Sequence, residues 1–210
     1  MKSIPIKEVR RIVLVFDLCS SSNILESLKL NDSLAKYYGF LIFVKEFLQE
    51  SAPLYKFEIY KFVGDGWILF FKETDAGKLV EFLPKLGEVI DEAITRRILP
   101  FMETPLRIQG ITCGVEVGVL RRIVMLQNRE YVGRPINIAC RLQGLVKTIA
   151  NPANKVLVSK GAYEKIFSGI DVSFWSPKRE RFSLRNIQGG REYSCVSLSL
   201  PFIELDRDDT

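Results

Sequence analysis

Alternating apolar and polar residues divide the first half of the chain into a strand, a helical segment, two strands and a helix. The apolar run RIVLVF predicts a buried strand, and period-3.6 patterns follow it. These elements are expected at residues 11–16, 20–49 with a break near Asn31, 55–63, 67–71 and 76–101. The second and third strands flank the triplet Gly64-Asp65-Gly66, which has the chemistry of a hairpin turn.

The second half continues with a glycine-interrupted strand, a partner strand, a helix that starts near Pro135, a short strand and helix, and two final strands. They are expected at 106–120, 121–126, 135–146, 156–159, 161–167, 171–175 and 193–200. The resulting β-α-β-β-α-β order predicts an α+β fold with a ferredoxin-like core. We expect an antiparallel sheet with helices on one side and extra strands at the C-terminal end.

Length and hydropathy indicate a single domain over residues 1–210. The chain is 47% hydrophobic, which is enough for one sizeable core. The ends, 1–9 and 201–210, are expected to be mobile. No apolar run approaches the roughly 20 residues of a membrane-spanning helix, and the start lacks the apolar stretch of a signal peptide. We therefore expect a cytoplasmic protein with no membrane partner.

The absence of histidine narrows the possible chemistry. A Ser-His-Asp hydrolase, a Cys-His protease and a His-ligated zinc site are all excluded. The four cysteines are scattered without a CxxC pair, so we expect buried, reduced thiols. The net charge of +5 suits nucleotides or other phosphates, but no long basic stripe indicates duplex binding.

Two carboxylates stand at the ends of buried strands. Asp17 follows the first strand, and Asp65 lies between the next two. In a β-α-β-β sheet these strands can be neighbours, which would bring both carboxylates to one edge. A hard divalent cation would relieve their repulsion, and Mg²⁺ is commonly held by one or two carboxylates plus substrate phosphates. The alternative is one turn aspartate and one helix-capping aspartate.

Four strings in order, FDLCSSS, KFVGDGWILFF, GITCGVEVG and EYVGRPINIACRL, resemble the catalytic domain of the class III nucleotidyl cyclases. The resemblance covers about residues 11–198. It implies that a nucleoside triphosphate is cyclised to a 3′,5′-cyclic monophosphate with release of pyrophosphate. It also implies a head-to-tail homodimer, in which one subunit supplies the metal aspartates and the other supplies an Asn/Arg pair.

The resemblance assigns roles to individual residues. Asp17 and Asp65 match the two metal-binding aspartates, and the carbonyl of Leu18 matches a backbone metal contact, so two divalent ions, Mg²⁺ or Mn²⁺, are implied. Asn137 matches the asparagine that orients the ribose, and Arg141 matches the arginine on the α-phosphate. Their i, i+4 spacing places both on one helix face.

Further positions match the triphosphate and base sites. Arg185 stands where the family has a triphosphate-binding lysine. Lys61 matches the residue that reads adenine in adenylate cyclases, and Glu130 matches its acidic or threonine partner. Lys61 and Glu130 would equally suit a surface ion pair. Tyr60 and Arg107 are added as candidates for lining the base pocket.

The chain departs from the family where many members read D-I-x-G-F-T after the first strand. Here the sequence is Asp17-Leu18-Cys19-Ser20-Ser21-Ser22. The strings YKFVGDGW and YVGRPINIACRLQ look like the bacterial anti-phage (Pycsar-type) pyrimidine cyclases. That resemblance implies a UTP or CTP substrate, a cyclic UMP or cyclic CMP product, and a separate cyclic-nucleotide-binding effector.

Three other interpretations stay open. The first is an adenylate cyclase that uses ATP, which Lys61 favours. The second is a cyclase-like module that binds nucleotide without turnover, which the altered loop at residues 20–22 favours. The third is a nucleic-acid-binding protein with an aromatic platform. The aromatics concerned are better explained as core residues of two buried strands; they are Phe57, Tyr60, Phe62, Trp67, Phe70 and Phe71.

Overall fold

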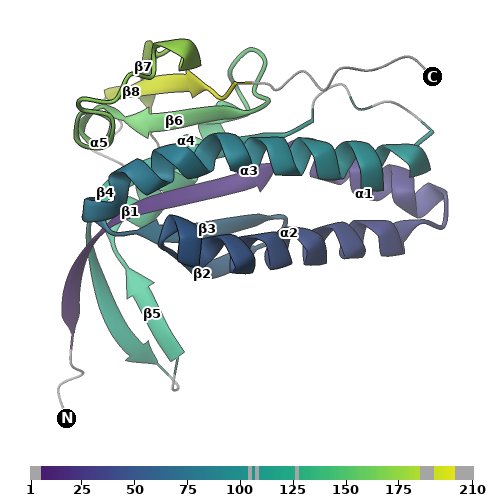
Figure 1. The fold of residues 1–210 in the computed structure, drawn as a ribbon, viewed down its shortest axis with the longest axis horizontal. Helices are drawn as coiled ribbons and strands as arrows, with labels where there is room; N and C mark the ends of the chain where they lie inside the picture. Colours follow the sequence, from purple (N-terminus) through teal and green to yellow (C-terminus); the bar gives the residue numbers. More distant parts are fainter. Residues whose placement is uncertain (1–5, 104–105, 107–108, 126–127, 185–191, 202–210) are drawn as a thin grey trace.

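The computed structural model describes residues 6–103, 106, 109–125, 128–184 and 192–201, which form one sheet with helices packed on it (Figure 1). The strands are β1 (Lys7–Leu18), β2 (Phe57–Val63), β3 (Gly66–Phe71), β4 (Ile111–Met125), β5 (Asn128–Val132), β6 (Lys155–Ser159), β7 (Lys178–Ser183) and β8 (Glu192–Ser199). The helices are α1 (Ser21–Leu30), α2 (Leu34–Tyr55), α3 (Ala76–Arg97), α4 (Arg134–Val146) and α5 (Lys160–Ile166). Short 3₁₀ helices lie at Glu73–Asp75, Leu99–Phe101 and Ser173–Trp175.

The strand order across the sheet is β2-β3-β1-β4-β6-β8-β7, and β5 pairs with the second half of β4. The pairs in the described sheet are antiparallel, apart from the parallel pair β4 and β6. The α+β class and the βαββαβ core with additional C-terminal strands are therefore confirmed. The predicted break near Asn31 is the gap between α1 and α2.

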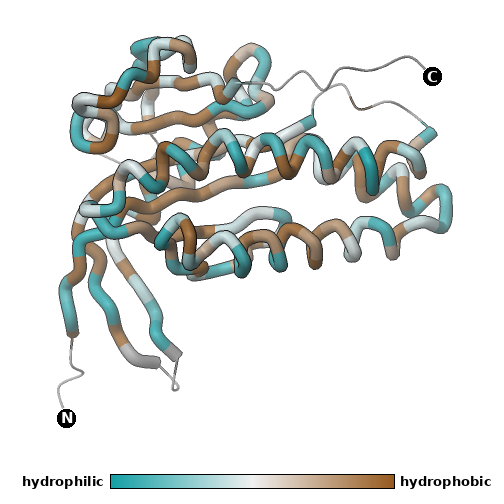
Figure 2. The backbone as a smooth tube through the Cα atoms, in the orientation of Figure 1, coloured by the Kyte–Doolittle hydropathy of each residue, from teal (hydrophilic) through white to brown (hydrophobic). Residues whose placement is uncertain are grey.

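The side chains of β1 alternate between two packed faces of the sheet. Ile12, Leu14 and Phe16 point to the face that α1, α2 and α3 cover, where they join the main core. Val13 and Val15 point to the opposite face and belong to a separate apolar cluster. Figure 2 shows the apolar residues that recur along α2 and α3 and the largely apolar β1 that these helices cover. Burial on both faces explains why the run RIVLVF is continuously apolar.

The helices of the predicted core, α1 to α3, lie on one face as expected, whereas α4 is an addition on the other face. It packs across β4 and β1, and its backbone comes so close that glycine is required beneath it. A Cβ on Gly114 would lie 2.0 Å from the carbonyl oxygen of Ala139. This close approach fixes α4 against the face of the sheet to which Val13 and Val15 point.

The segment after Leu120 differs from the prediction. Instead of a separate partner strand at 121–126, β4 runs unbroken from Ile111 to Met125. Arg121 and Arg122 interrupt the apolar pattern, but they stay in the strand because they pair with both β5 and the start of β1. The predicted boundary at Arg121 is therefore wrong, because this half of β4 lies outside the apolar core that set the pattern.

The C-terminal region contains a second correction. The apolar residues at 171–175 were expected to form a strand, but Ser173–Trp175 is a 3₁₀ helix whose Trp175 is buried. The strand of this region is β7, with the sequence KRERFS. It is an edge strand rich in charge, so it carries little of the hydrophobic signal by which strands are recognised.

Two smaller expectations also change. Lys7–Val9 belong to β1 and pair with β4, so this part of the N-terminal end is ordered in the sheet. Cys19, Cys113 and Cys195 are buried free thiols as expected, whereas Cys140 on α4 is exposed. Of the aromatics assigned to the core, Phe62 is 52% exposed.

None of the helices that the structure describes is long and apolar enough to cross a membrane.

Candidate functional site

The turn between β2 and β3 brings Asp65 next to Asp17. Val63 pairs with Gly66, so Gly64 and Asp65 form a two-residue hairpin turn, and Gly64 supplies its positive φ of 71°. Gly66 also pairs with Asp17 on β1. A Cβ on Gly66 would lie 2.4 Å from the carbonyl oxygen of Phe16, so only glycine lets the turn approach the end of β1 so closely.

The two carboxylates form a partly dry, electronegative pair. The Asp17 side chain is only 16% exposed. Burial raises the pKa of Asp17, the nearby charge of Asp65 raises it further, and a hydrogen bond from Lys147 opposes both effects. Burial and the same two carboxylates raise the pKa of Tyr37 on α2 to about 12. Asp65 therefore turns the chain and also contributes charge to a shared site.

The donor set suits a divalent metal ion. The Oδ2 atom of Asp65 is buried, and it has no hydrogen-bond partner among the residues that the structure describes. A third acidic or thiol side chain does not join the pair within the described part of the chain. Two carboxylates fit Mg²⁺ or Mn²⁺ when water and substrate phosphates complete the coordination, and they do not fit a closed structural metal centre.

Two residues that the sequence did not indicate also reach this site, one from α4 and one from its C-terminal cap. The Nζ atom of Lys147 lies 2.6 Å from Oδ2 of Asp17, and Nε2 of Gln143 lies 3.4 Å from the same oxygen. Gln143 also donates to Oγ1 of Thr112 on β4 at 2.8 Å. Both contacts span more than 120 residues of sequence, so only the i, i+4 spacing of these two polar residues could have suggested them.

Asn137 and Arg141 lie on a different side of the same helix. Asn137 is exposed and Arg141 half-exposed, and neither forms a hydrogen bond or ion pair with another described residue. At about 1.5 Å and 100° per residue, Asn137 is roughly 15 Å along α4 from Lys147. The Asn137 and Arg141 side is also turned by roughly 120° from the side that meets Asp17. Within one chain, the predicted α-phosphate and ribose residues therefore do not reach the carboxylate pair.

Three of the candidate base-pocket residues do come together. Oε2 of Glu130 accepts hydrogen bonds from the Tyr60 hydroxyl and from the Lys61 amine, each at 2.7 Å. The Tyr60 ring stacks on Phe70, with ring centroids 4.7 Å apart, and its hydroxyl also accepts from the backbone N–H of Tyr131. The hydrogen bond from Lys61 lowers the pKa of Glu130.

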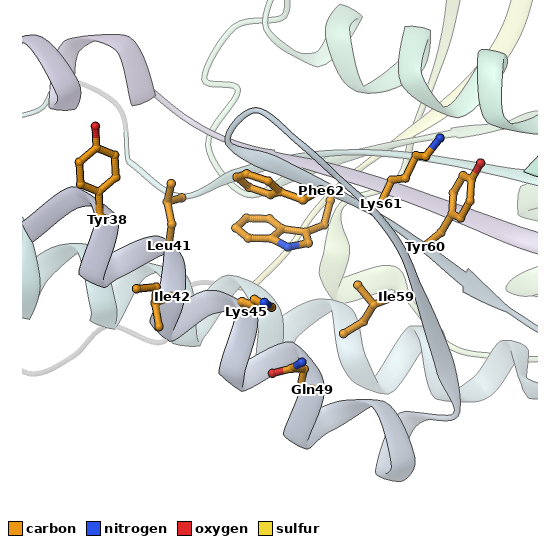
Figure 3. Close-up of a pocket in the computed structure, with 10 residues that line it drawn as sticks. Tyr38, Leu41, Ile42, Lys45, Gln49, Ile59, Tyr60, Lys61 and Phe62 are labelled. Atoms are coloured by element: carbon orange, nitrogen blue, oxygen red, sulfur yellow. The ribbon is translucent and has the colours of Figure 1, made fainter. Parts of the chain in front are cut away.

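A β-bulge makes this arrangement possible. Successive strand residues normally point to opposite faces, but Ile59 pairs with Leu69 and Lys61 with Ile68, so Tyr60 is an extra residue. Tyr60 and Lys61 consequently leave β2 on the same side, away from α2, as Figure 3 shows. Ile59 and Phe62 point toward α2 and line a groove of about 680 Å³, whose lining also includes Tyr60 and Lys61.

The remaining candidates are only partly described. Arg107 and Arg185 lie outside the described residues. Leu18 is the last residue of β1, and its side chain is buried in the main core. Ser20, in the loop that departs from the family pattern, has a left-handed backbone with φ of 57°. A glycine would adopt this conformation without steric cost, so the loop keeps a glycine-like path with a serine in place.

Sequence comparisons return no relative: no protein-family model matches the chain, and no curated protein does. Solved structures with a similar fold exist. The adenylyl cyclase CyaB from P. aeruginosa superposes with a TM-score of 0.71 and 17% identity over 96% of this chain and 100% of that one. The guanylyl cyclase Cya2 superposes with a TM-score of 0.69 and 14% identity over 95% of this chain and 96% of that one.

A third structure is the catalytic core of a rhodopsin-guanylyl cyclase with converted specificity, in complex with ATPαS. It gives a TM-score of 0.61 and 16% identity over 93% of this chain and 98% of that one. At this level of identity the comparisons show the fold, which is that of adenylyl and guanylyl cyclase catalytic domains. The activity of this chain has to be argued from its own residues.

Proposed function

We propose that the protein is a metal-dependent nucleotidyl cyclase, which converts a nucleoside triphosphate to a 3′,5′-cyclic monophosphate and pyrophosphate. The observation that carries the proposal is the pair Asp17 and Asp65, with a buried carboxylate oxygen left without a described partner. The same face of the sheet carries α4 with Asn137 and Arg141. The likeness to solved adenylyl and guanylyl cyclases supports the same activity.

In this proposal Asp17, Asp65 and the carbonyl of Leu18 hold two divalent ions, Mg²⁺ or Mn²⁺. When bound, the ions would lower the pKa of the ribose 3′-hydroxyl and neutralise negative charge on the phosphates. Histidine is then not needed as a general base, which agrees with its absence from the chain. Because burial keeps the carboxylates partly dry, their attraction for a cation is stronger than it would be in bulk water.

The other residues act on the nucleotide. Asn137 orients the ribose, and Arg141 donates hydrogen bonds to the α-phosphate, where negative charge develops during attack of the 3′-oxygen. Arg185 binds the triphosphate. The side chains of Asn137 and Arg141 form no hydrogen bond or ion pair with another described residue, so their polar groups are available to a ligand.

The active unit in this proposal is a head-to-tail homodimer with composite sites. In one chain, Asn137 lies roughly 15 Å along α4 from the residue that meets Asp17. An in-line phosphoryl transfer needs the metal ligands and the α-phosphate arginine around a single phosphate group. A second copy related by a two-fold axis supplies Asn137 and Arg141 to the carboxylate pair of the first.

For the base we propose a pyrimidine, so that UTP gives cyclic UMP or CTP gives cyclic CMP. Tyr60, Lys61, Arg107 and Glu130 line this pocket. The resemblance to the pyrimidine cyclases supports this choice, and the bulge brings Tyr60 beside Lys61 and Glu130. Adenine is the second candidate, because a lysine donor beside a carboxylate acceptor also matches its ring nitrogen and amino group.

The resemblance to anti-phage cyclases supports a role for the product as a cytoplasmic second messenger in bacterial antiviral defence. A separate effector that binds cyclic nucleotides would read it. Nucleic acid and membranes have no part in this proposal.

The test is to incubate the purified protein with Mn²⁺ and each of ATP, GTP, CTP and UTP separately and to identify the products by mass. A cyclic monophosphate from UTP or CTP alone supports the pyrimidine proposal, and one from ATP supports the second candidate. Nucleotide binding without any product would contradict the cyclase proposal and favour a binding module.

A further inference from the structure

Lys147 forms the most direct polar contact with the candidate metal site. Its Nζ atom is 2.6 Å from Oδ2 of Asp17, while its side chain is 51% exposed. The residue caps the C-terminal end of α4, directly after Val146. A long, partly exposed side chain at a helix end can leave its partner without disturbing the packed helix behind it.

The charges around the site explain why such a contact forms. Asp17 and Asp65 together carry two negative charges, and Lys147 supplies one positive charge, so the cluster keeps one net negative charge. Lys147 satisfies one oxygen of Asp17, whereas Oδ2 of Asp65 stays without a described partner. The amine therefore neutralises the site in part and leaves it attractive to a cation.

We infer that Lys147 is an internal counterion of the metal-free site, which holds Asp17 until a divalent ion displaces it. A divalent ion and an ammonium group repel each other, and both would bind the same oxygen, Oδ2 of Asp17. Binding of the metal therefore releases Lys147 into solvent, and Lys147 lowers the affinity of the site for metal. This inference rests on the proposed function, because it takes Asp17 and Asp65 as the metal ligands.

The first test is a titration of the full-length protein with Mn²⁺ in the absence of nucleotide, in which free Mn²⁺ is measured by electron paramagnetic resonance. Lys147→Met removes the charge but keeps most of the side-chain length. We expect it to bind Mn²⁺ on the order of tenfold more tightly than the wild type, because one repelling charge is lost. Lys147→Arg keeps the charge and should bind close to the wild type.

A matched control is Lys85→Met, which breaks a surface ion pair with Glu88 on α3 and should leave Mn²⁺ affinity unchanged. Asp17→Asn should weaken Mn²⁺ binding at least tenfold. If it does so while Lys147→Met binds equally or more weakly than the wild type, the counterion inference is wrong and the metal site stands. If Asp17→Asn binds like the wild type, both the metal site and the inference are wrong.

A second measurement avoids substitution and any loss of folding. The amines of the wild-type protein are acetylated with and without saturating Mg²⁺, and the rate at each lysine is followed by mass spectrometry. Mg²⁺ should increase the rate at Lys147 several-fold and leave Lys85 unchanged. An equal rate at Lys147 in both conditions would overturn the inference.

Discussion

A single glutamate, Glu116, and the pair Asp17 and Asp65 lie on the α4 side of the sheet, and they differ in how many hydrogen bonds their carboxylate oxygens accept. Glu116 on β4 is 6% exposed and accepts three hydrogen bonds. They come from the Ser159 hydroxyl at 2.8 Å, the Val117 backbone N–H at 2.9 Å and the Tyr193 hydroxyl at 2.7 Å. In the pair Asp17 and Asp65, by contrast, one buried oxygen lacks a described partner.

This difference separates a carboxylate that is fully paired within the fold from the pair to which we assign metal binding. A buried carboxylate costs stability unless its oxygens are hydrogen-bonded, so Glu116 and its three donors tie β4 to β6 and β8. In the pair Asp17 and Asp65, the carboxylate oxygen without a described hydrogen-bond partner lowers stability, and a bound cation would offset this loss. Loss of Glu116 should therefore affect folding, and loss of Asp65 should affect chemistry.

The largest expected effect is that of Asp65→Asn. The substitution keeps the shape of the turn and removes one of the two charges of the proposed metal site. Product formation should fall by on the order of 10³-fold, while the melting temperature stays equal or rises, because repulsion with Asp17 is lost. Product quantification by mass and differential scanning fluorimetry measure the two outcomes, and full activity would refute the metal assignment.

The next effect is that of Arg141→Ala, which removes a donor to the α-phosphate. We expect kcat to fall about 10²-fold with little change in KM, because the interaction strengthens in the transition state. Mixing this variant with Asp65→Asn should restore activity, since each mixed dimer keeps one intact composite site. An unchanged kcat, or no recovery on mixing, would contradict the assigned role or the shared site.

Substitution of Glu116 tests the other side of the comparison. Glu116→Ala leaves two hydroxyl groups and one N–H without their acceptor, and should lower the free energy of unfolding by about 1–3 kcal/mol. Turnover per folded molecule should stay within about twofold of the wild type. Urea denaturation measures the first quantity, and a thousandfold loss of turnover in folded protein would place Glu116 in the chemistry instead.

The smallest expected effect on stability is that of Lys61→Met. The Lys61 pair with Glu130 lies at the surface, so its loss should leave the free energy of unfolding nearly unchanged. KM for the preferred nucleotide should rise roughly tenfold, because a donor to the base is lost. Lys78→Met, which breaks an exposed pair with Glu81 on α3, is the matched control and should leave KM unchanged.

The sequence predicted the elements whose pattern reflects burial on the sheet. The strand RIVLVF, the turn at Gly64 and Asp65, and the meeting of Asp65 with Asp17 all follow from apolar runs and glycine chemistry. Strand β7 was missed because its charged residues carry no burial signal. The boundary at Arg121 was misplaced because that half of β4 is held by strand pairing rather than by the core.

The site was predicted less completely than the fold. Asp17 and Asp65 were recognisable because each stands at the end of an apolar strand. Lys147 and Gln143 were not, because their contacts depend on how closely α4 approaches β4 over Gly114. The grouping of Tyr60 with Lys61 on one side of β2 depends on a bulge that an apolar pattern does not reveal.

The placement of α4 has a consequence for how the proposed dimer responds to its ligands. One side of this helix meets Asp17 of its own chain through Gln143 and Lys147, and in the proposed dimer another side would present Asn137 and Arg141 to the partner. In that dimer each α4 would belong to both proposed sites at once. A ligand that shifts the whole helix at one site would therefore change the other site as well, whereas release of the Lys147 side chain alone would leave Asn137 and Arg141 in place.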